Sequence, residues 1–178
     1  MIDLRFRELP SQLECGGSFY ELDTDFRTWI EFERCLREDG RIWGGIFKDR
    51  IPPSPEWVEA AIEFLLSENA TPRQTGSEGV RAVDYVLDGD YIVAAFQQAY
   101  GIDLTSCEYM HWHRFKALFT GLPDETRMAK IMGYRTWTKS DRKFEDEMRE
   151  NRARWALPEG EEQSESDEVL QFVEEFFG

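Results

Sequence analysis

Apolar residues recur at helical spacing through most of the chain, and polar residues occupy the positions between them. A period of three to four residues is typical of helices that bury one face. The pattern predicts a mainly α fold, a compact bundle of about six helices. The expected helices cover 24–39, 55–66, 88–100 (starting at Asp88 or Asp90), 105–120, 123–133 and 139–154.

Residues that favour helix ends support these boundaries. Ser54 can cap a helix whose first position is Pro55, because proline has no N–H to leave unpaired there. Thr105 and Glu108 have the spacing of a capping box, which predicts a helix start at Thr105. Gly101 and Gly133 stand where two of the helices should end.

A β-hairpin is predicted near the N-terminus. Leu13–Cys15 and Ser18–Leu22 flank Gly16 and Gly17. Two glycines between short apolar runs suit a tight turn, because glycine accepts a positive φ without strain.

Acidic residues are concentrated at the C-terminal end of the chain. Residues 157–178 hold eight Asp or Glu and no Lys or Arg, whereas the preceding residues hold 28 acidic and 21 basic side chains. The polar run after Pro158 is typical of a solvated linker. We therefore expect a helical domain with its hairpin over 1–157, and an acidic linker with a C-terminal amphipathic helix over 158–178.

Composition narrows the class of protein. The net charge of −15 argues against non-specific binding to nucleic acid, which depends on cationic side chains. The sequence has neither an apolar run of about 20 residues nor a signal-peptide core, so we expect no membrane association and a cytoplasmic location. Three scattered cysteines fit a reducing compartment.

Residues that could support catalysis are few. His111 and His113 would lie roughly 200° apart on the predicted helix, too far around it to chelate one metal ion. Cys107 and His111 have the spacing of a thiol and its base, but no oxyanion-hole motif accompanies them. We therefore predict a protein that is not an enzyme and has no cofactor or metal.

The C-terminal segment is the strongest candidate for binding a partner. Asp167, Glu168, Glu174 and Glu175 occupy the side opposite its apolar face. Such a helix either folds back on its own core or binds in a groove of another protein. The apolar residues of this face are Val169, Leu170, Phe172, Val173, Phe176 and Phe177.

A second candidate surface lies on the charged helix expected over 139–154. Its narrow apolar stripe consists of Phe144, Met148 and Trp155. The remaining residues of the helix are mostly charged, which is also typical of a plain solvated face.

Several stretches of the chain together form a recognisable pattern. The longest are Asp90–Leu104, Met110–Leu122 and Lys130–Arg135, and shorter ones are Gly16-Gly17, Tyr20, Thr24–Ile30 and Trp155–Pro158. In combination they resemble the bacteriophage gene-product-fifteen family, from the tail region of long-tailed phages and prophages of Gram-positive bacteria. The family pattern has a second aromatic residue where this chain has His113, and the acidic tail lies outside the resemblance.

The resemblance implies a non-enzymatic tail assembly chaperone in the cytoplasm of the bacterial host, absent from the mature virion. Its partner would be the tape-measure protein, and tail-tube subunits or a second copy of the chain are further candidates. Two other hypotheses stay open. One is an acidic mimic that inhibits a host nucleic-acid-binding protein, and the other is an enzyme that uses Cys107 and His111.

Overall fold

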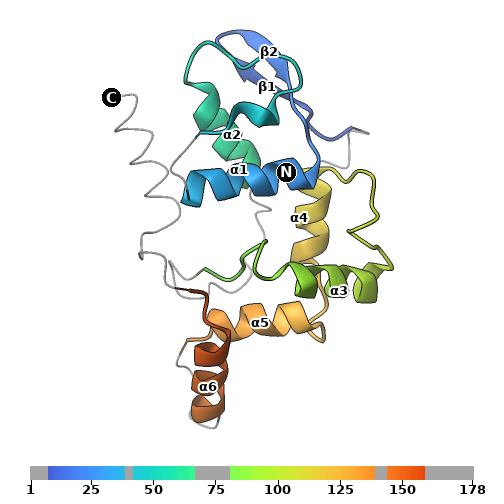
Figure 1. The fold of residues 1–178 in the computed structure, drawn as a ribbon, viewed down its shortest axis with the longest axis vertical. Coiled ribbons are helices and arrows are strands. Elements are labelled where there is room, and N and C mark those ends of the chain that lie inside the picture. Colours follow the sequence, from blue (N-terminus) through green and yellow to red (C-terminus); the bar gives the residue numbers. More distant parts are fainter. Residues whose placement is uncertain (1–7, 39–41, 67–80, 139–143, 159–178) are drawn as a thin grey trace. The chain divides into compact units, whose positions relative to one another are not determined.

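The computed structural model describes residues 8–38, 42–66, 81–138 and 144–158. These residues form two compact units that alternate along the chain. The first unit comprises the described residues up to 66 together with 108–117, and the second comprises 81–107 and the described residues from 118 to 158. Six α-helices and one β-hairpin lie in the described ranges, which confirms the predicted mainly α fold (Figure 1).

The hairpin forms where the sequence predicts it. Gly16 and Gly17 have φ values of +56° and +73°, so both occupy the left-handed region that the tight turn requires. Leu13 pairs with Tyr20 across the strands, and both side chains are buried. The antiparallel strands are β1 (Gln12–Cys15) and β2 (Ser18–Glu21).

Aromatic side chains from three helices form the core of the first unit. The Phe26 ring stacks on Phe115 with centroids 4.7 Å apart, and Trp29 packs on Phe64 at 4.3 Å. Trp112 Nε1 donates a hydrogen bond of 3.1 Å to the Leu65 carbonyl. The helical elements are α1 (Phe26–Glu38), the 3-10 helix η1 (Gly44–Ile46), α2 (Trp57–Leu66) and residues 112–117 of α4 (Trp112–Thr120).

The predicted helix start at Thr105 is wrong, because α4 begins at Trp112. The Asp103 carboxylate accepts hydrogen bonds from both the N–H and the hydroxyl of Thr105, at 2.8 and 2.6 Å. The Thr105 hydroxyl is therefore committed to a turn before the helix. His111, just ahead of α4, forms an isolated antiparallel bridge with Asp25.

The second unit contains the remaining helices. Gly101 ends α3 with a φ of +67°, as predicted. The predicted stop at Gly133 is wrong, because α5 continues to Arg135 with Gly133 inside it. Thr126 caps α5 by accepting a hydrogen bond from the Ala129 N–H. The bounds are α3 (Gly89–Tyr100), α5 (Arg127–Arg135) and α6 (Glu145–Trp155).

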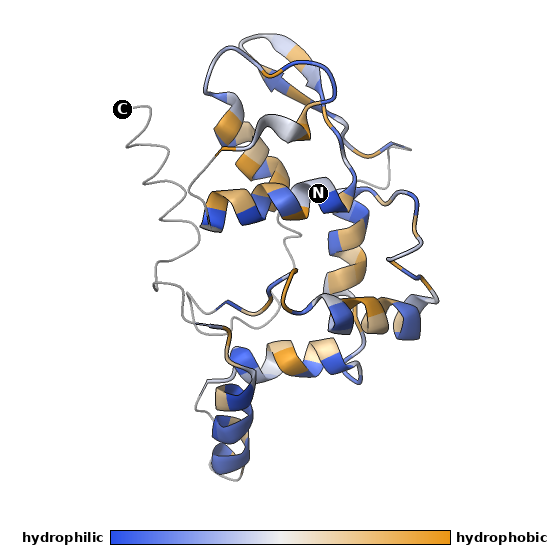
Figure 2. Cartoon of the chain, viewed as in Figure 1, coloured by the Kyte–Doolittle hydropathy of each residue, from blue (hydrophilic) through white to orange (hydrophobic). Residues whose placement is uncertain are grey.

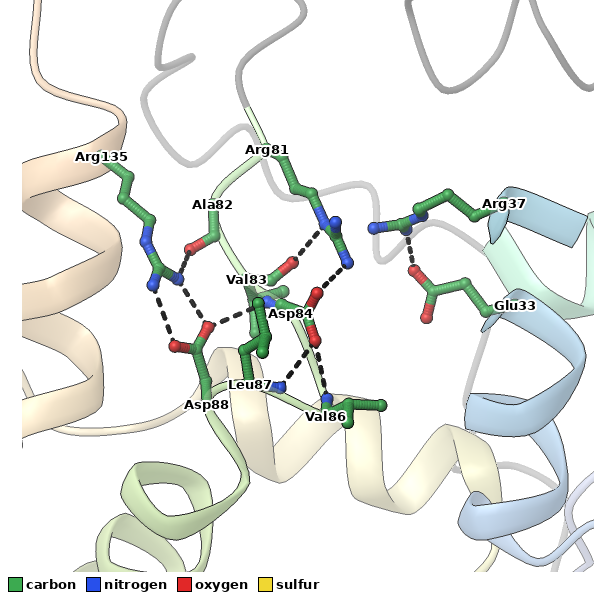
Figure 3. A network of polar contacts seen from close by, with 10 residues as sticks. All are labelled: Glu33, Arg37, Arg81, Ala82, Val83, Asp84, Val86, Leu87, Asp88 and Arg135. Atoms are coloured by element: carbon green, nitrogen blue, oxygen red, sulfur yellow. Dashed lines mark hydrogen bonds and ion pairs between the residues drawn. The ribbon is translucent and has the colours of Figure 1, made fainter. Parts of the chain in front are cut away.

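A buried ion pair connects the parts of this unit. Arg135 donates to both Asp88 carboxylate oxygens, at 2.5 and 2.9 Å, and both side chains are at most 6% exposed (Figure 3). The same guanidinium donates to the carbonyl oxygens of Ala82 and Trp155. Asp88 precedes α3, yet its side chain makes no capping bond to the helix. One cation thus joins α5 to the start of α3 and the end of α6.

Removing this cation should destabilise the second unit strongly. Arg135→Met leaves the Asp88 carboxylate buried and without its ion-pair partner, which costs about 3 to 5 kcal/mol. Urea unfolding followed by circular dichroism measures the loss. The control is Arg149→Met, because the Arg149–Asp146 pair is mostly exposed and worth at most about 1 kcal/mol. Equal losses in the two variants would contradict the assigned role of Arg135.

Candidate partner-binding surfaces

The six apolar residues of the C-terminal segment, from Val169 to Phe177, lie outside the described residues. Their role as a partner-binding face stays a prediction. The predicted domain boundary near Pro158 also stays a prediction, because Pro158 is the last described residue of the chain.

The structure separates the three residues of the apolar stripe on α6. Phe144, at the start of the helix, is 62% exposed, whereas Met148 is half-buried. Trp155 packs within its own unit: the Tyr91 ring meets it edge-on at 5.5 Å, and the Arg127 guanidinium lies 4.8 Å from its centroid. Trp155 therefore anchors the end of α6, and Phe144 is the member best placed to meet a partner.

The rest of α6 offers little apolar surface. None of its residues is buried, and the helix is hydrophilic over most of its length (Figure 2). Its first turn is acidic and its last turn carries Arg152 and Arg154, the order that the helix dipole favours. These charges stabilise α6 as a helix although none of its side chains is buried.

A pair of exposed apolar residues that sequence reasoning missed lies just before α3. Val86 and Leu87 are 62% and 57% exposed. Their backbone N–H groups both donate to Asp84 Oδ1, each at 2.8 Å, so the turn that carries them is held in place (Figure 3). Hydropathy alone predicts burial for Val and Leu, and no local signal indicates that this turn faces solvent.

His111 and His113 are both buried, although only His113 lies on a helix. The expectation that both lie on one helix is therefore wrong. Their ring centroids are 5.2 Å apart. His111 Nδ1 accepts the His113 backbone N–H at 3.1 Å, and the Nε2 atoms face the carbonyl oxygens of Pro10 and Phe64 at 2.8 and 3.2 Å.

This arrangement favours the neutral form of both rings. Burial lowers the pKa of His111, and lowers the pKa of His113 to about 4. A neutral ring with its proton on Nε2 can donate to the facing carbonyl, and His111 Nδ1 is then free to accept. Across the described residues, no group of three or more His, Cys, Asp or Glu is placed to hold a metal ion.

Acid should therefore destabilise the first unit through His113. Its folded pKa lies below the unfolded value, so its contribution is complete above pH 6.5 and is lost as the pH falls towards 4. The expected loss is on the order of 2 to 3 kcal/mol. His113→Phe keeps a ring against Phe64 and cannot titrate. Its unfolding free energy, measured at several pH values, should fall less steeply than that of the parent, and an equal slope would contradict the assignment.

The structure does not support the pairing of Cys107 with His111 on one helix. Cys107 lies before α4, and its N–H donates to the Asp103 carbonyl. Cys15 and Cys35 are buried thiols, and none of these described cysteines is in a disulfide. The i,i+4 argument for a thiol and its base therefore loses its geometric premise.

Within the described ranges, no helix has both the length and the apolar character that a membrane span requires.

Comparison with protein families gives a match over most of the helical part of the chain. The model of a family described as Bacteriophage Gp15 protein matches residues 57–157, more than half of the chain. The matched stretch runs from the first residue of α2 to two residues beyond the end of α6. No curated protein and no solved structure matches the chain.

Proposed function

The chain belongs to the Bacteriophage Gp15 protein family, and from this membership we propose that it is a tail assembly chaperone that binds the tape-measure protein. Besides family membership, the observation that supports partner binding is the acidic, amphipathic sequence of residues 167–177. It combines six large apolar residues with four carboxylates on the other side.

This combination suits the task of a chaperone for a helical partner. A tape-measure protein is a long helical chain whose apolar stripes must stay covered until tail-tube subunits assemble around it. An amphipathic helix can cover such a stripe by laying its own apolar face against it. The charge of −15 then keeps neighbouring complexes apart in solution.

Phe144 is a second contact in this proposal. Its exposed ring at the start of α6 adds apolar area, whereas Trp155 is committed to Tyr91 and Arg127. The protein acts without catalysis or a cofactor, in the cytoplasm of the bacterial host, and does not stay in the mature virion. Tail-tube subunits and self-association are secondary partners, and neither nucleic acid nor a membrane is bound.

Co-expression with the neighbouring tape-measure protein tests the proposal. The full chain should keep the tape-measure protein soluble and co-purify with it. A double variant, Phe172→Ser with Phe176→Ser, should lose most of the complex, because it removes two aromatic side chains from the apolar face. The matched control is Gln171→Ser with Glu175→Ser, which changes the same number of residues on the polar side and should bind like the parent.

The outcomes separate the parts of the proposal. No soluble complex with the full chain would contradict tape-measure binding, and the tail-tube protein would be tested next. Capture that is equal for a chain ending at Pro158 would place the contact in the helical body and contradict the role of the C-terminal segment. Displacement of the partner by DNA would favour the acidic-mimic hypothesis instead.

A further inference from the structure

Helix α6 carries opposite charges at its two ends. Its first turn holds Glu145, Asp146 and Glu147, and its last turn holds Arg152 and Arg154. None of these side chains is buried. A second helix of the same sequence, laid antiparallel to the first, places an acidic end beside a basic end and opposes the two helix dipoles. The charge pattern of α6 is therefore complementary to itself.

One face of α6 has the spacing of a coiled-coil seam. Phe144, Met148, Asn151 and Trp155 follow one another at intervals of four, three and four residues. Phe144 is 62% exposed, and Met148 and Asn151 are half-buried. Trp155 already packs on Tyr91 of its own unit. The apolar surface that can meet another helix therefore lies in the first half of α6.

Glu and Arg side chains line this face on both sides. Glu145 and Arg152 lie on one flank and Glu147 and Arg154 on the other, seven residues apart in each case. In an antiparallel pair with a two-fold axis, each flank meets the same flank of the second copy. Glu145 then lies opposite Arg152 and Glu147 opposite Arg154, and the symmetry makes each contact twice. No like charges meet on either flank.

The present contacts of these side chains allow the exchange. Arg154 donates to Glu150 at 3.1 Å, but the two side chains are 62% and 73% exposed. Exposed pairs of this kind contribute little, so Arg154 can change its partner at small cost. The four acidic and three basic side chains of α6 leave the helix nearly neutral. At physiological salt, charge elsewhere on the chain is screened beyond about 8 Å.

We propose that two copies of the chain pair through α6, antiparallel and about a two-fold axis, with four Glu–Arg contacts beside Phe144 and Met148. The helix has 11 residues and is about 16 Å long, so the interface is small and the dimer dissociates on dilution. The pairing does not rest on the proposed tape-measure binding. It does cover Phe144, so a second copy and a tape-measure protein compete for this one side chain.

Sedimentation equilibrium of the full chain alone, at physiological salt, tests the pairing. The parent should show a reversible monomer–dimer equilibrium. Glu147→Arg should weaken the dimer about tenfold, because two attractive contacts become two contacts between like charges. Arg154→Glu should weaken it equally. The matched control is Asp146→Arg, which makes the same charge change in the same turn but on the opposite side of the helix, where the side chain is 92% exposed. This control should associate like the parent, and circular dichroism checks that every variant keeps its helices.

Mixtures of variants test the orientation. Glu147→Arg mixed with Arg154→Glu should associate like the parent, because the exchanged charges are again opposite between unlike copies. Glu147→Arg mixed with Arg152→Glu should stay weak, because positions 147 and 152 face each other only in a parallel pair.

Four results would overturn the proposal. They are a parent that stays monomeric at every concentration at which it is soluble, a Glu147→Arg variant that associates like the parent, an equal loss in Asp146→Arg, and recovery in the second mixture instead of the first. The chain is measured without a partner, so failure to bind the tape-measure protein would refute the proposed function and leave this result standing.

Discussion

The buried ion pair between Arg135 and Asp88 holds the second unit together. Burying two charges is costly unless each finds hydrogen-bond partners that replace water. Arg135 meets this condition with both Asp88 oxygens and two backbone carbonyls. Asp88 also accepts the Asp84 N–H. The start of α3, the end of α5 and the end of α6 are thus fixed by one set of bonds, and the exposed turn at Val86 and Leu87 is fixed with them.

Local physics made part of this structure predictable. The Gly16–Gly17 turn and the end of α3 at Gly101 follow from the positive φ that glycine accepts, and the structure confirms both. The mainly α class follows from the spacing of apolar residues. The start of α4 was not predictable in this way, because Asp103 competes for the Thr105 hydroxyl that the capping box needs. The continuation of α5 through Gly133 shows that one glycine does not end a helix whose cap and buried face are in place.

The contacts that matter most join residues far apart in sequence. Nothing near Arg135 indicates that its partner is Asp88, 47 residues earlier. The division into two units is equally hard to predict from the sequence, because the units alternate along the chain. Hydropathy indicates which residues are buried, but it does not indicate which residues they pack against. Of the candidate surface, the sequence named Phe144, which the structure places exposed just before α6, and its role in binding stays a prediction. The sequence could not indicate that Trp155 is occupied by Tyr91 and Arg127, or that Val86 and Leu87 are exposed.

Family membership and the proposed binding element concern different parts of the chain. The family match ends at residue 157, so the apolar segment 169–177 lies beyond it. In this account the part of the chain that matches the family lies in the helical body, and the part that binds the partner is the C-terminal segment. Hydrogen exchange of the full chain, with and without bound tape-measure protein, tests that division most directly. The account predicts that binding slows exchange in residues 166–178 and leaves α1 to α5 unchanged. Slower exchange within those helices, with none in the tail, would contradict it.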